Sequence, residues 1–410
     1  MLGPGLLWAG AAIGVSHLVQ STRAGASYGF ELVWVIIAAN LFKYPFFEFA
    51  PRYTVATGES LLEGYNRLGR WGIALYILLT FGTMFTLQAA ITIVTAGVTA
   101  NIFFPGADIL TVTIVLLIGC AVIIAIGRYS VLDRIIKAVI ILLTLSTIFA
   151  VFSALFGVAP ERSAIELPSF NWSLTDLAFL IAFVGWMPTA IDVSVWHSYW
   201  TLAKKEQSPE SFSMKPALFD FNVGYFGTAF LAVGFLSLGA LVMHNSGETF
   251  SDNSTMFASQ VIKLYTSSIG NWAYYIIAVA ALATMFSTTL TCLDAYPRVL
   301  TPAFQLLVKR KTSPEKKWMP IAWILMLIVG SSILVAYFVS SLKFLVDLAT
   351  TLSFLTAPVL GYMNFRVVTA KHVPEQHRPS KAFQFFSIIC LIVLSAVAVY
   401  YLIWRFGNFT

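Results

Sequence analysis

The sequence predicts an all-α polytopic membrane protein. Of its 410 residues, 58% are hydrophobic and only 11% are charged, and the mean hydropathy is +0.81. Because soluble domains carry roughly 25% charged residues, a water-soluble fold is excluded. Each of eleven apolar segments is long enough to cross the hydrocarbon core as a helix, which takes about 20 residues. These segments are centred near residues 16, 42, 88, 118, 145, 187, 230, 285, 328, 354 and 393.

Two of the segments are interrupted by residues that break helices. The first is interrupted at Gly14-Val15-Ser16-His17, and the sixth at Gly185-Trp186-Met187-Pro188-Thr189. Backbone groups that leave the helix within the membrane are tolerated only where they line a cavity or are buried in protein. Interrupted helices at corresponding positions of two halves indicate a transporter's substrate site. We therefore expect a substrate site built from Gly14, Ser16, His17, Gly185, Met187 and Thr189.

The order of the segments indicates two related halves. Segments one to five and six to ten form two units of five spans, and the interruption lies in the first span of each unit. An odd number of spans inverts the second unit, which gives the LeuT-like fold: a 5+5 inverted repeat with helices 1 and 6 broken, plus an eleventh helix. We expect one transmembrane domain over 1–410, with repeats at 1–158 and 174–365 and the extra helix at 382–405.

Basic residues predict the orientation in the membrane. A cytoplasmic N-terminus places inside loops at about 51–70, 127–137, 202–216, 298–318 and 366–382, and these loops hold 19 of the 25 Lys and Arg residues. This positive-inside bias fixes the orientation, and eleven spans then predict an outside C-terminus. The short chain without tails favours a bacterial inner membrane, and no cleavable signal pattern precedes the first span. The bias also accounts for the net charge of +6, so we expect a lipid bilayer and no nucleic acid as partner, and the oligomeric state stays open.

The remaining composition points away from catalysis. Cys120, Cys292 and Cys390 lie far apart in apolar runs, so neither a disulfide framework nor a cysteine-based metal site is expected. The sequence has no nucleotide-binding loop, no His-Glu-x-x-His motif and no arguable nucleophile–base arrangement. We therefore expect a protein that is not an enzyme and that has no cofactor, apart from a coupling proton or other cation.

Several short motifs occur in order along nearly the whole chain. They are Gly3-Pro4-Gly5, the run from Arg23 to Trp34, the run from Arg52 to Gly58, Gly127-Arg128-Tyr129 with Val131-Leu132-Asp133, Met187-Pro188, and Ser287-Thr288-Thr289-Leu290. Together they resemble the NRAMP (natural resistance-associated macrophage protein) family of divalent-metal transporters. The resemblance implies that family's fold and a secondary transporter that works by alternating access.

The metal chemistry of that family is not matched. Its metal-binding Asp-Pro-Gly-Asn aligns with Gly14-Val15-Ser16-His17, and Thr189 replaces the histidine of its Met-Pro-His motif. Its third helix carries an acidic pair, whereas Tyr76 to Phe103 contains no acid. A carboxylate about 4 Å from a dication contributes on the order of 8 kcal/mol at an effective dielectric near 20. We therefore expect a site that no longer carries the usual transition metals; any retained metal site would use His17 and Met187.

Two basic side chains near the first interruption are further candidates, because ionisable groups inside a membrane are functional by default. His17 could bind an anionic group, donate to a carbonyl or carry a proton; the alternative is a neutral imidazole that holds the unwound backbone. Arg23 lies about 9 Å further along the helix axis and could gate an anionic substrate. The alternative is an interfacial arginine that snorkels or pairs with Glu31.

Asp192 is the main candidate for a carboxylate that couples transport to protons or another cation, because no basic residue lies three or four positions from it. Three other acids have a basic residue four positions away, which is typical of structural neutralisation: the pairs are Glu48–Arg52, Asp294–Arg298 and Asp347–Lys343. Asp347 is the second choice for coupling or gating, because the tenth helix borders the cavity in this fold. Asp220 is expected to be structural.

Three functions remain open at this point. The first is transport of a small polar, zwitterionic or anionic solute, which the lost carboxylates favour. The second is transport of a divalent metal ion through an altered site. The third is a non-transporting sensor, which would be marked by an added soluble domain.

Overall fold

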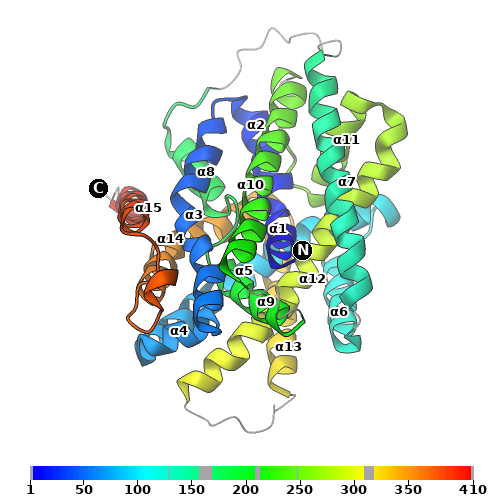
Figure 1. Cartoon of the computed structure of the whole chain (residues 1–410). Coiled ribbons are helices and arrows are strands. Elements are labelled where there is room, and N and C mark those ends of the chain that lie inside the picture. Colours follow the sequence, from blue (N-terminus) through cyan, green and yellow to red (C-terminus); the bar gives the residue numbers. More distant parts are fainter. Residues whose placement is uncertain are drawn as a thin grey trace.

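A computed structural model of the chain describes residues 3–127, 129–156, 169–207, 213–246, 248–308 and 318–407. All regular structure in these ranges is helical (Figure 1). Eight helices are long and apolar enough to cross a membrane. Helix α7 and two interrupted helices complete the eleven predicted spans. Arg128, Arg162 and the basic cluster at 309–317 lie outside the described residues.

The first repeat contains five spans and one short helix between the second and third spans. Its first span consists of two α-helices joined by a π-helical turn. The elements are α1 (Pro4–Ala12), η1 (Ser16–Ser21), α2 (Thr22–Tyr28), α3 (Val33–Thr57), the short α4 (Leu61–Arg67), α5 (Arg70–Phe103), α6 (Ile109–Ile126) and α7 (Tyr129–Phe156).

The second repeat follows the same plan and is followed by the eleventh span. The elements are α8 (Leu174–Gly185), α9 (Val193–Gln207), α10 (Met214–Leu238), the π-helical η3 (Gly239–Met243), η4 (His244–Ser246), α11 (Ser254–Ile269), η5 (Asn271–Ala273), α12 (Tyr274–Leu307), α13 (Trp318–Phe338), α14 (Leu342–Val368), η6 (Glu375–His377) and α15 (Lys381–Gly407). Helix α15 lies at the periphery beside α14 (Figure 1) and also contacts α3.

The two short helices α4 and α11 occupy equivalent places in the two repeats, after the second span of each. Helix α4 begins with a capping box, in which Ser60 accepts from the Glu63 backbone and Glu63 accepts from the Ser60 backbone. Helix α11 begins at an Asn253 side chain that accepts from two backbone amides. Much of the polar stretch from Asn245 to Ser268 is therefore helical.

Glycines let the first span pack against the seventh span backbone to backbone. A Cβ on Gly5 would lie 2.1 Å from the carbonyl oxygen of Asp220, and one on Gly25 would lie 1.9 Å from that of Leu236. From the other side, a Cβ on Gly239 would lie 2.2 Å from the carbonyl oxygen of Thr22. Because any larger residue would clash at these positions, both halves of the first span are held directly against α10 and η3.

Candidate functional site

The break in the first span is short. Ile13 ends α1 with extended backbone (φ −76°, ψ 92°), and the chain resumes helical geometry by Val15. The sequence placed the break over residues 14–17, but Ser16 and His17 belong to the π-helical turn η1. The wider spacing of that turn still accommodates the change of direction, so the irregular backbone is confined to Ile13 and Gly14.

His17 stabilises the backbone at this break through contacts of both of its ring nitrogens. The ring is fully buried, and Nε2 lies 3.0 Å from the carbonyl oxygen of Thr228 in α10. Nδ1 lies 2.7 Å from the Ser16 hydroxyl and 3.1 Å from the carbonyl oxygen of Ala12, one of the carbonyls that the break frees. The imidazole therefore ties the end of α1 to α10, and in this conformation neither nitrogen is available to a substrate.

The break in the sixth span is longer and leaves residues 186–192 outside regular helix. Gly185 ends α8 directly against α14, because a Cβ there would lie 1.9 Å from the carbonyl oxygen of Thr350. The next residue, Trp186, donates its indole N–H to Ser353 of α14 at 2.7 Å. The sequence analysis explained the glycine at position 185 by the backbone groups that it frees. The structure gives a second reason, which is the close packing of Gly185 against α14.

Lys43 of α3 supplies a positive charge to this second break. Its side chain is fully buried, and Nζ donates to the carbonyl oxygens of Val184 (2.6 Å), Gly185 (2.8 Å) and Thr189 (3.5 Å). The last carbonyls of a helix have no intrahelical partner and carry a partial negative charge. The ammonium therefore satisfies the end of α8, and sequence reasoning did not identify Lys43 as part of the site.

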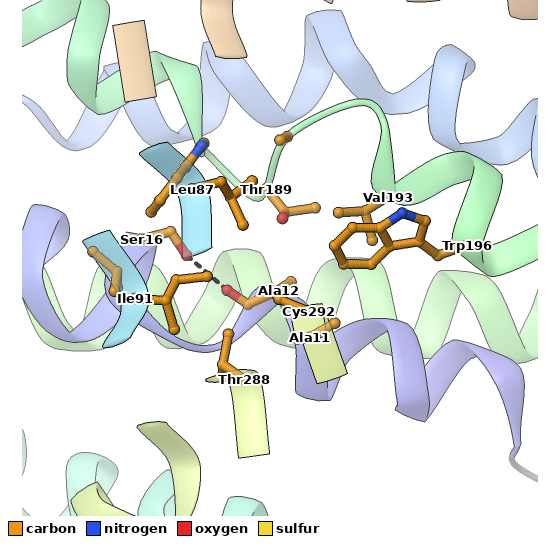
Figure 2. Close-up of a pocket in the computed structure, with 13 residues that line it drawn as sticks. Ala11, Ala12, Ser16, Leu87, Ile91, Thr189, Val193, Trp196, Thr288 and Cys292 are labelled. Carbon is orange, nitrogen blue, oxygen red and sulfur yellow. Dashed lines mark hydrogen bonds between the residues drawn. The ribbon is translucent and has the colours of Figure 1, made fainter. Parts of the chain in front are cut away.

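A cavity of about 20 Å³ lies between the two breaks (Figure 2). A cavity of this size holds about one water molecule. All thirteen lining residues are buried. They are Ala11, Ala12, Val15 and Ser16 of the first span, Leu87 and Ile91 of α5, Trp186, Thr189, Ala190, Val193 and Trp196 of the sixth span, and Thr288 and Cys292 of α12.

Two of the six predicted substrate-site residues line this cavity. Ser16 and Thr189 face it from opposite breaks (Figure 2). Gly14, His17, Gly185 and Met187 are not among the lining residues. Met187 instead packs in an apolar cluster with residues that include Tyr28 and Phe183. These four positions shape the backbone around the cavity.

Sequence reasoning also missed Thr288, which donates weakly to the Ile13 carbonyl (3.4 Å) across the first break. Cys292 lies one turn further along α12 and lines the same cavity. Both lie on the face of α12 that meets the broken helices. The sequence shows Thr288 only as part of the motif Ser287-Thr288-Thr289-Leu290, and it does not show which face of the helix meets the site. Lys43, in contrast, had a usable signal, because it is an isolated basic residue within an apolar span.

Asp192 lies at the start of α9, on the side of the cavity toward the predicted cytoplasmic end. Its side chain is buried, and its Oδ1 has no hydrogen-bond partner among the residues that the structure describes. It interacts electrostatically with Tyr76, Tyr296 and Cys292. The Tyr296 hydroxyl also lacks a hydrogen-bond partner. Asp192 does not line the cavity itself; its incompletely satisfied carboxylate lies in a buried polar cluster next to the lining residues Val193 and Cys292.

Arg23 and Asp347 form a two-armed ion pair on the opposite side of the cavity. Arg23 donates from Nη1 and Nη2 to the two carboxylate oxygens of Asp347 at 2.7 and 3.1 Å. Gln20, one turn above the cavity, donates to Asp347 at 3.0 Å and accepts from Arg23 at 2.9 Å. The guanidinium also lies over the Phe179 ring, 5.1 Å from its centroid. The outer half of the first span is thereby joined to α14.

The expected partners of two charged residues were wrong. Lys343 pairs with Asp252 at 3.3 Å instead of with Asp347, because Asp347 faces the first span and Lys343 faces the loop before α11. Glu31 accepts from the backbone of Phe170 at 2.8 Å, so Arg23 does not depend on it.

Three other expectations for charged residues are confirmed. Glu48 pairs with Arg52 (2.5 Å), and Asp294 pairs with Arg298 (2.6 Å). Asp220 is structural, since its carboxylate accepts from the backbone amides of Gly3 (2.9 Å) and Gly5 (2.7 Å) at the start of α1.

The solved structures that this chain resembles are membrane transporters. The manganese transporter of Eremococcus coleocola, in complex with an aromatic bis-isothiourea substituted compound, superposes with a TM-score of 0.73 at 14% identity, covering 100% of this chain and 88% of that one. MhsT in complex with L-phenylalanine gives 0.63 at 14% identity (98% and 97%). The nucleobase-cation-symport-1 family transporter Mhp1, with bromovinylhydantoin bound, gives 0.58 at 16% identity (98% and 92%). These matches confirm the LeuT-like fold.

Sequence comparison gives the family. An uncharacterised protein of Pasteurella multocida (strain Pm70) is 36% identical over 411 residues, which cover 99% of this chain and 92% of the relative. The profile described as "Natural resistance-associated macrophage protein-like" matches residues 5–404. The chain therefore belongs to the Nramp family of membrane transporters.

Proposed function

We propose that this protein is a secondary transporter of the Nramp family whose remodelled central site moves a small polar or charged solute by alternating access. The observation that carries the proposal is the cavity between the two broken helices, which hydroxyl, thiol, indole and apolar groups line without any carboxylate. A pocket of this composition suits a small organic solute, held by a few placed polar groups on an apolar wall.

Access to the cavity requires the surrounding helices to move. With room for about one water, the cavity must expand before it can take a solute, and every lining side chain is buried. The Arg23–Asp347 pair closes the path on the predicted outer side. The cluster around Asp192 and Tyr296 closes it on the predicted inner side, where Asp192 is the coupling carboxylate. Opening one side while the other stays closed is alternating access.

The alternative cargo, a divalent metal ion at an altered site, has less support. Such a site would use His17 and Met187. Both nitrogens of His17 are engaged by the protein itself, and Met187 packs in an apolar cluster away from the cavity. Hard ions also favour oxygen ligands with charge, and the family's metal-binding carboxylate is Gly14 here. Metal binding would therefore require these groups to rearrange.

Alternating access can be tested without knowing the solute, because Cys292 is a native thiol in the cavity wall. A variant with Cys120→Ala and Cys390→Ala leaves Cys292 as the single thiol. In sealed vesicles of both orientations, we expect membrane-impermeant thiosulfonates to modify Cys292 slowly from either side. Conditions that speed labelling from one side should slow it from the other. Simultaneous acceleration from both sides would indicate a channel, and labelling of a Cys292→Ala control would invalidate the readout.

The cargo is tested by binding. Titration calorimetry of the purified protein with Mn²⁺, Cd²⁺ and Mg²⁺ should give no saturable heat, and a solute screen should find small organic molecules that protect Cys292 from modification. Metal binding in the millimolar range or tighter, lost in Met187→Ala or His17→Ala, would replace the organic-solute proposal by the metal one.

A further inference from the structure

The break in the sixth span has the geometry of a cation site that a protein side chain already fills. Three carbonyl oxygens, those of Val184, Gly185 and Thr189, converge on the Nζ atom of Lys43 at 2.6, 2.8 and 3.5 Å. Two of them belong to the last turn of α8, whose end carries partial negative charge. An ammonium has three N–H donors, so these three acceptors match its full hydrogen-bonding capacity.

Lys43 depends on these carbonyls because no carboxylate in the described part of the chain forms an ion pair with it. The next acid along α3, Glu48, is bound by the guanidinium of Arg52. An ammonium with no exposed surface loses its hydration, and buried charges are paired or otherwise strongly coordinated. Here backbone carbonyls provide that coordination, as they do for bound metal and alkali ions.

We propose that Lys43 is a tethered cation that occupies a cation-binding site at the sixth-span break, and that it thereby excludes free metal and alkali ions from this site. Lys43 is thus a specificity-determining residue of the transport centre. The inference rests on the proposed function, since it supplies a physical reason for a changed cargo. A free cation would have to displace a group that is covalently attached to α3 and therefore always present at high local concentration.

Removing the side chain of Lys43 should leave a site for a free alkylammonium ion. Lys43→Ala deletes Cγ, Cδ, Cε and Nζ, which together have the size and charge of propylammonium. The vacated space would lead from α3 to the same three carbonyls. A propylammonium ion should therefore bind to this variant and stabilise it, because a ligand that binds only the folded state raises stability by mass action.

The experiment measures the apparent Tm of the full-length protein in detergent from its tryptophan fluorescence. Lys43→Ala and Lys43→Met are each titrated with propylammonium chloride, and equal concentrations of 1-propanol and tetramethylammonium chloride serve as controls. The methionine variant keeps an uncharged stem in place. Lys343→Ala is the matched control, because Lys343 is a partly exposed lysine whose ammonium pairs with Asp252.

We expect both Lys43 variants to have a lower Tm than the wild type. Propylammonium should raise the Tm of Lys43→Ala saturably, whereas 1-propanol and tetramethylammonium should not. The wild type, Lys43→Met and Lys343→Ala should not respond. A Tm for Lys43→Met equal to that of the wild type would overturn the proposal, since the ammonium would then be dispensable. Equal responses of Lys43→Ala to propylammonium and tetramethylammonium would overturn it as well.

If Lys43→Ala is recovered only when propylammonium is present throughout purification, that requirement supports the proposal; failure even then counts against it. Calorimetry with Mn²⁺ separates this inference from the proposed function. Mn²⁺ binding to the wild type would refute the organic-solute function whatever the Tm data show. A wild type without Mn²⁺ binding, combined with a Lys43→Ala variant that does not respond to propylammonium, would refute the role of Lys43 and leave the solute proposal standing.

Discussion

The two helix breaks face the same cavity, yet the protein stabilises them in different ways. The first break spans Ile13 and Gly14, and the hydroxyls of Ser16 and Thr288 donate to the carbonyls of Ala12 and Ile13 beside it. The second spans residues 186–192 and has a buried ammonium at one end and a buried carboxylate, Asp192, at the other. Both repeats thus contain a broken helix at the cavity, while the buried charged side chains lie at the second break.

This difference indicates which break is free to change during transport. Neutral hydrogen bonds contribute about 1 kcal/mol each and can be exchanged for bonds to a solute. A buried charge that loses its partners costs several kcal/mol, so the carbonyl cluster around Lys43 is the harder of the two to rearrange. We expect the hydrogen bonds at the first break to change when a solute binds, and the structure of the second break to stay the same.

The largest expected effect is steric, and it differs between Gly185 and Gly14, the glycines at the two breaks. Gly185→Ala would force a Cβ to within 1.9 Å of the Thr350 carbonyl oxygen, and backbone atoms cannot rotate away. We expect a loss of about 3 kcal/mol and little folded protein. In Gly14→Ala the nearest atoms are the Thr288 hydroxyl and methyl, at 2.9 and 3.0 Å; a side chain can shift further than a backbone carbonyl, so the Tm should fall less than in Gly185→Ala. Size-exclusion profiles and Tm measurements compare them; equal losses would contradict the assignment.

A smaller effect is expected when the imidazole at the first break is removed. His17→Ala leaves the Thr228 carbonyl without its 3.0 Å partner, and an unpaired buried acceptor costs about 1–3 kcal/mol. The Tm should fall, and Cys292 should become more reactive because the end of α1 loosens. Ser16→Ala is the matched variant, since it removes a neighbouring neutral group and should cost less. An unchanged labelling rate in His17→Ala would show that the imidazole does not hold the break.

The outer ion pair should act on access more than on stability. Both Arg23→Gln and Asp347→Asn break the same contacts, so we expect each to speed modification of Cys292 from the outside, and the double variant to add little. Partly exposed pairs contribute about 1 kcal/mol or less to stability, so the Tm should shift only slightly. Additive effects on labelling would mean that the two residues act separately.

The smallest expected effect is a pH response outside the membrane, which must be separated from any response of Asp192. Burial, with the Arg67 and Arg378 cations nearby, lowers the pKa of His372 below its usual 6.5. A lowered folded-state pKa means that His372 favours folding above pH 6.5, and that this contribution is lost as the pH falls through the folded-state pKa. The Tm should therefore decrease slightly on acidification, and His372→Gln should lack that component.

Because thiosulfonates react with the thiolate, labelling of the unfolded protein gives the intrinsic pH dependence of the Cys292 reaction. Asp192→Asn should abolish the pH dependence of labelling in the folded protein that exceeds this intrinsic part, while leaving the fold intact. A pH dependence that is unchanged in Asp192→Asn would refute the coupling role.

The fold could be predicted from the sequence because hydropathy, helix-breaking residues and their order along the chain are local properties. The site could be predicted only in part. The pairing of Arg23 with Asp347 joins residues 324 positions apart, and the i,i+4 spacing of Lys343 favoured a different partner. The role of Lys43 likewise depends on a helix 141 positions away. Which charges meet is decided by helix packing, and a single sequence does not contain that information.

The close glycine packing of the first span has a mechanical consequence. Helix α1 is bound to α10 through Gly5 and the Asp220 carboxylate, and α2 is bound to η3 through Gly25 and Gly239. These contacts lie on both sides of the bend at Gly14, so α1 cannot rotate outward about Gly14 without α10. Any displacement of one half of the first span pulls on α10, and α10 continues into η3, against which the other half is packed. The first and seventh spans therefore move as one unit across the membrane, and a displacement at one end of this unit is transmitted to the other end.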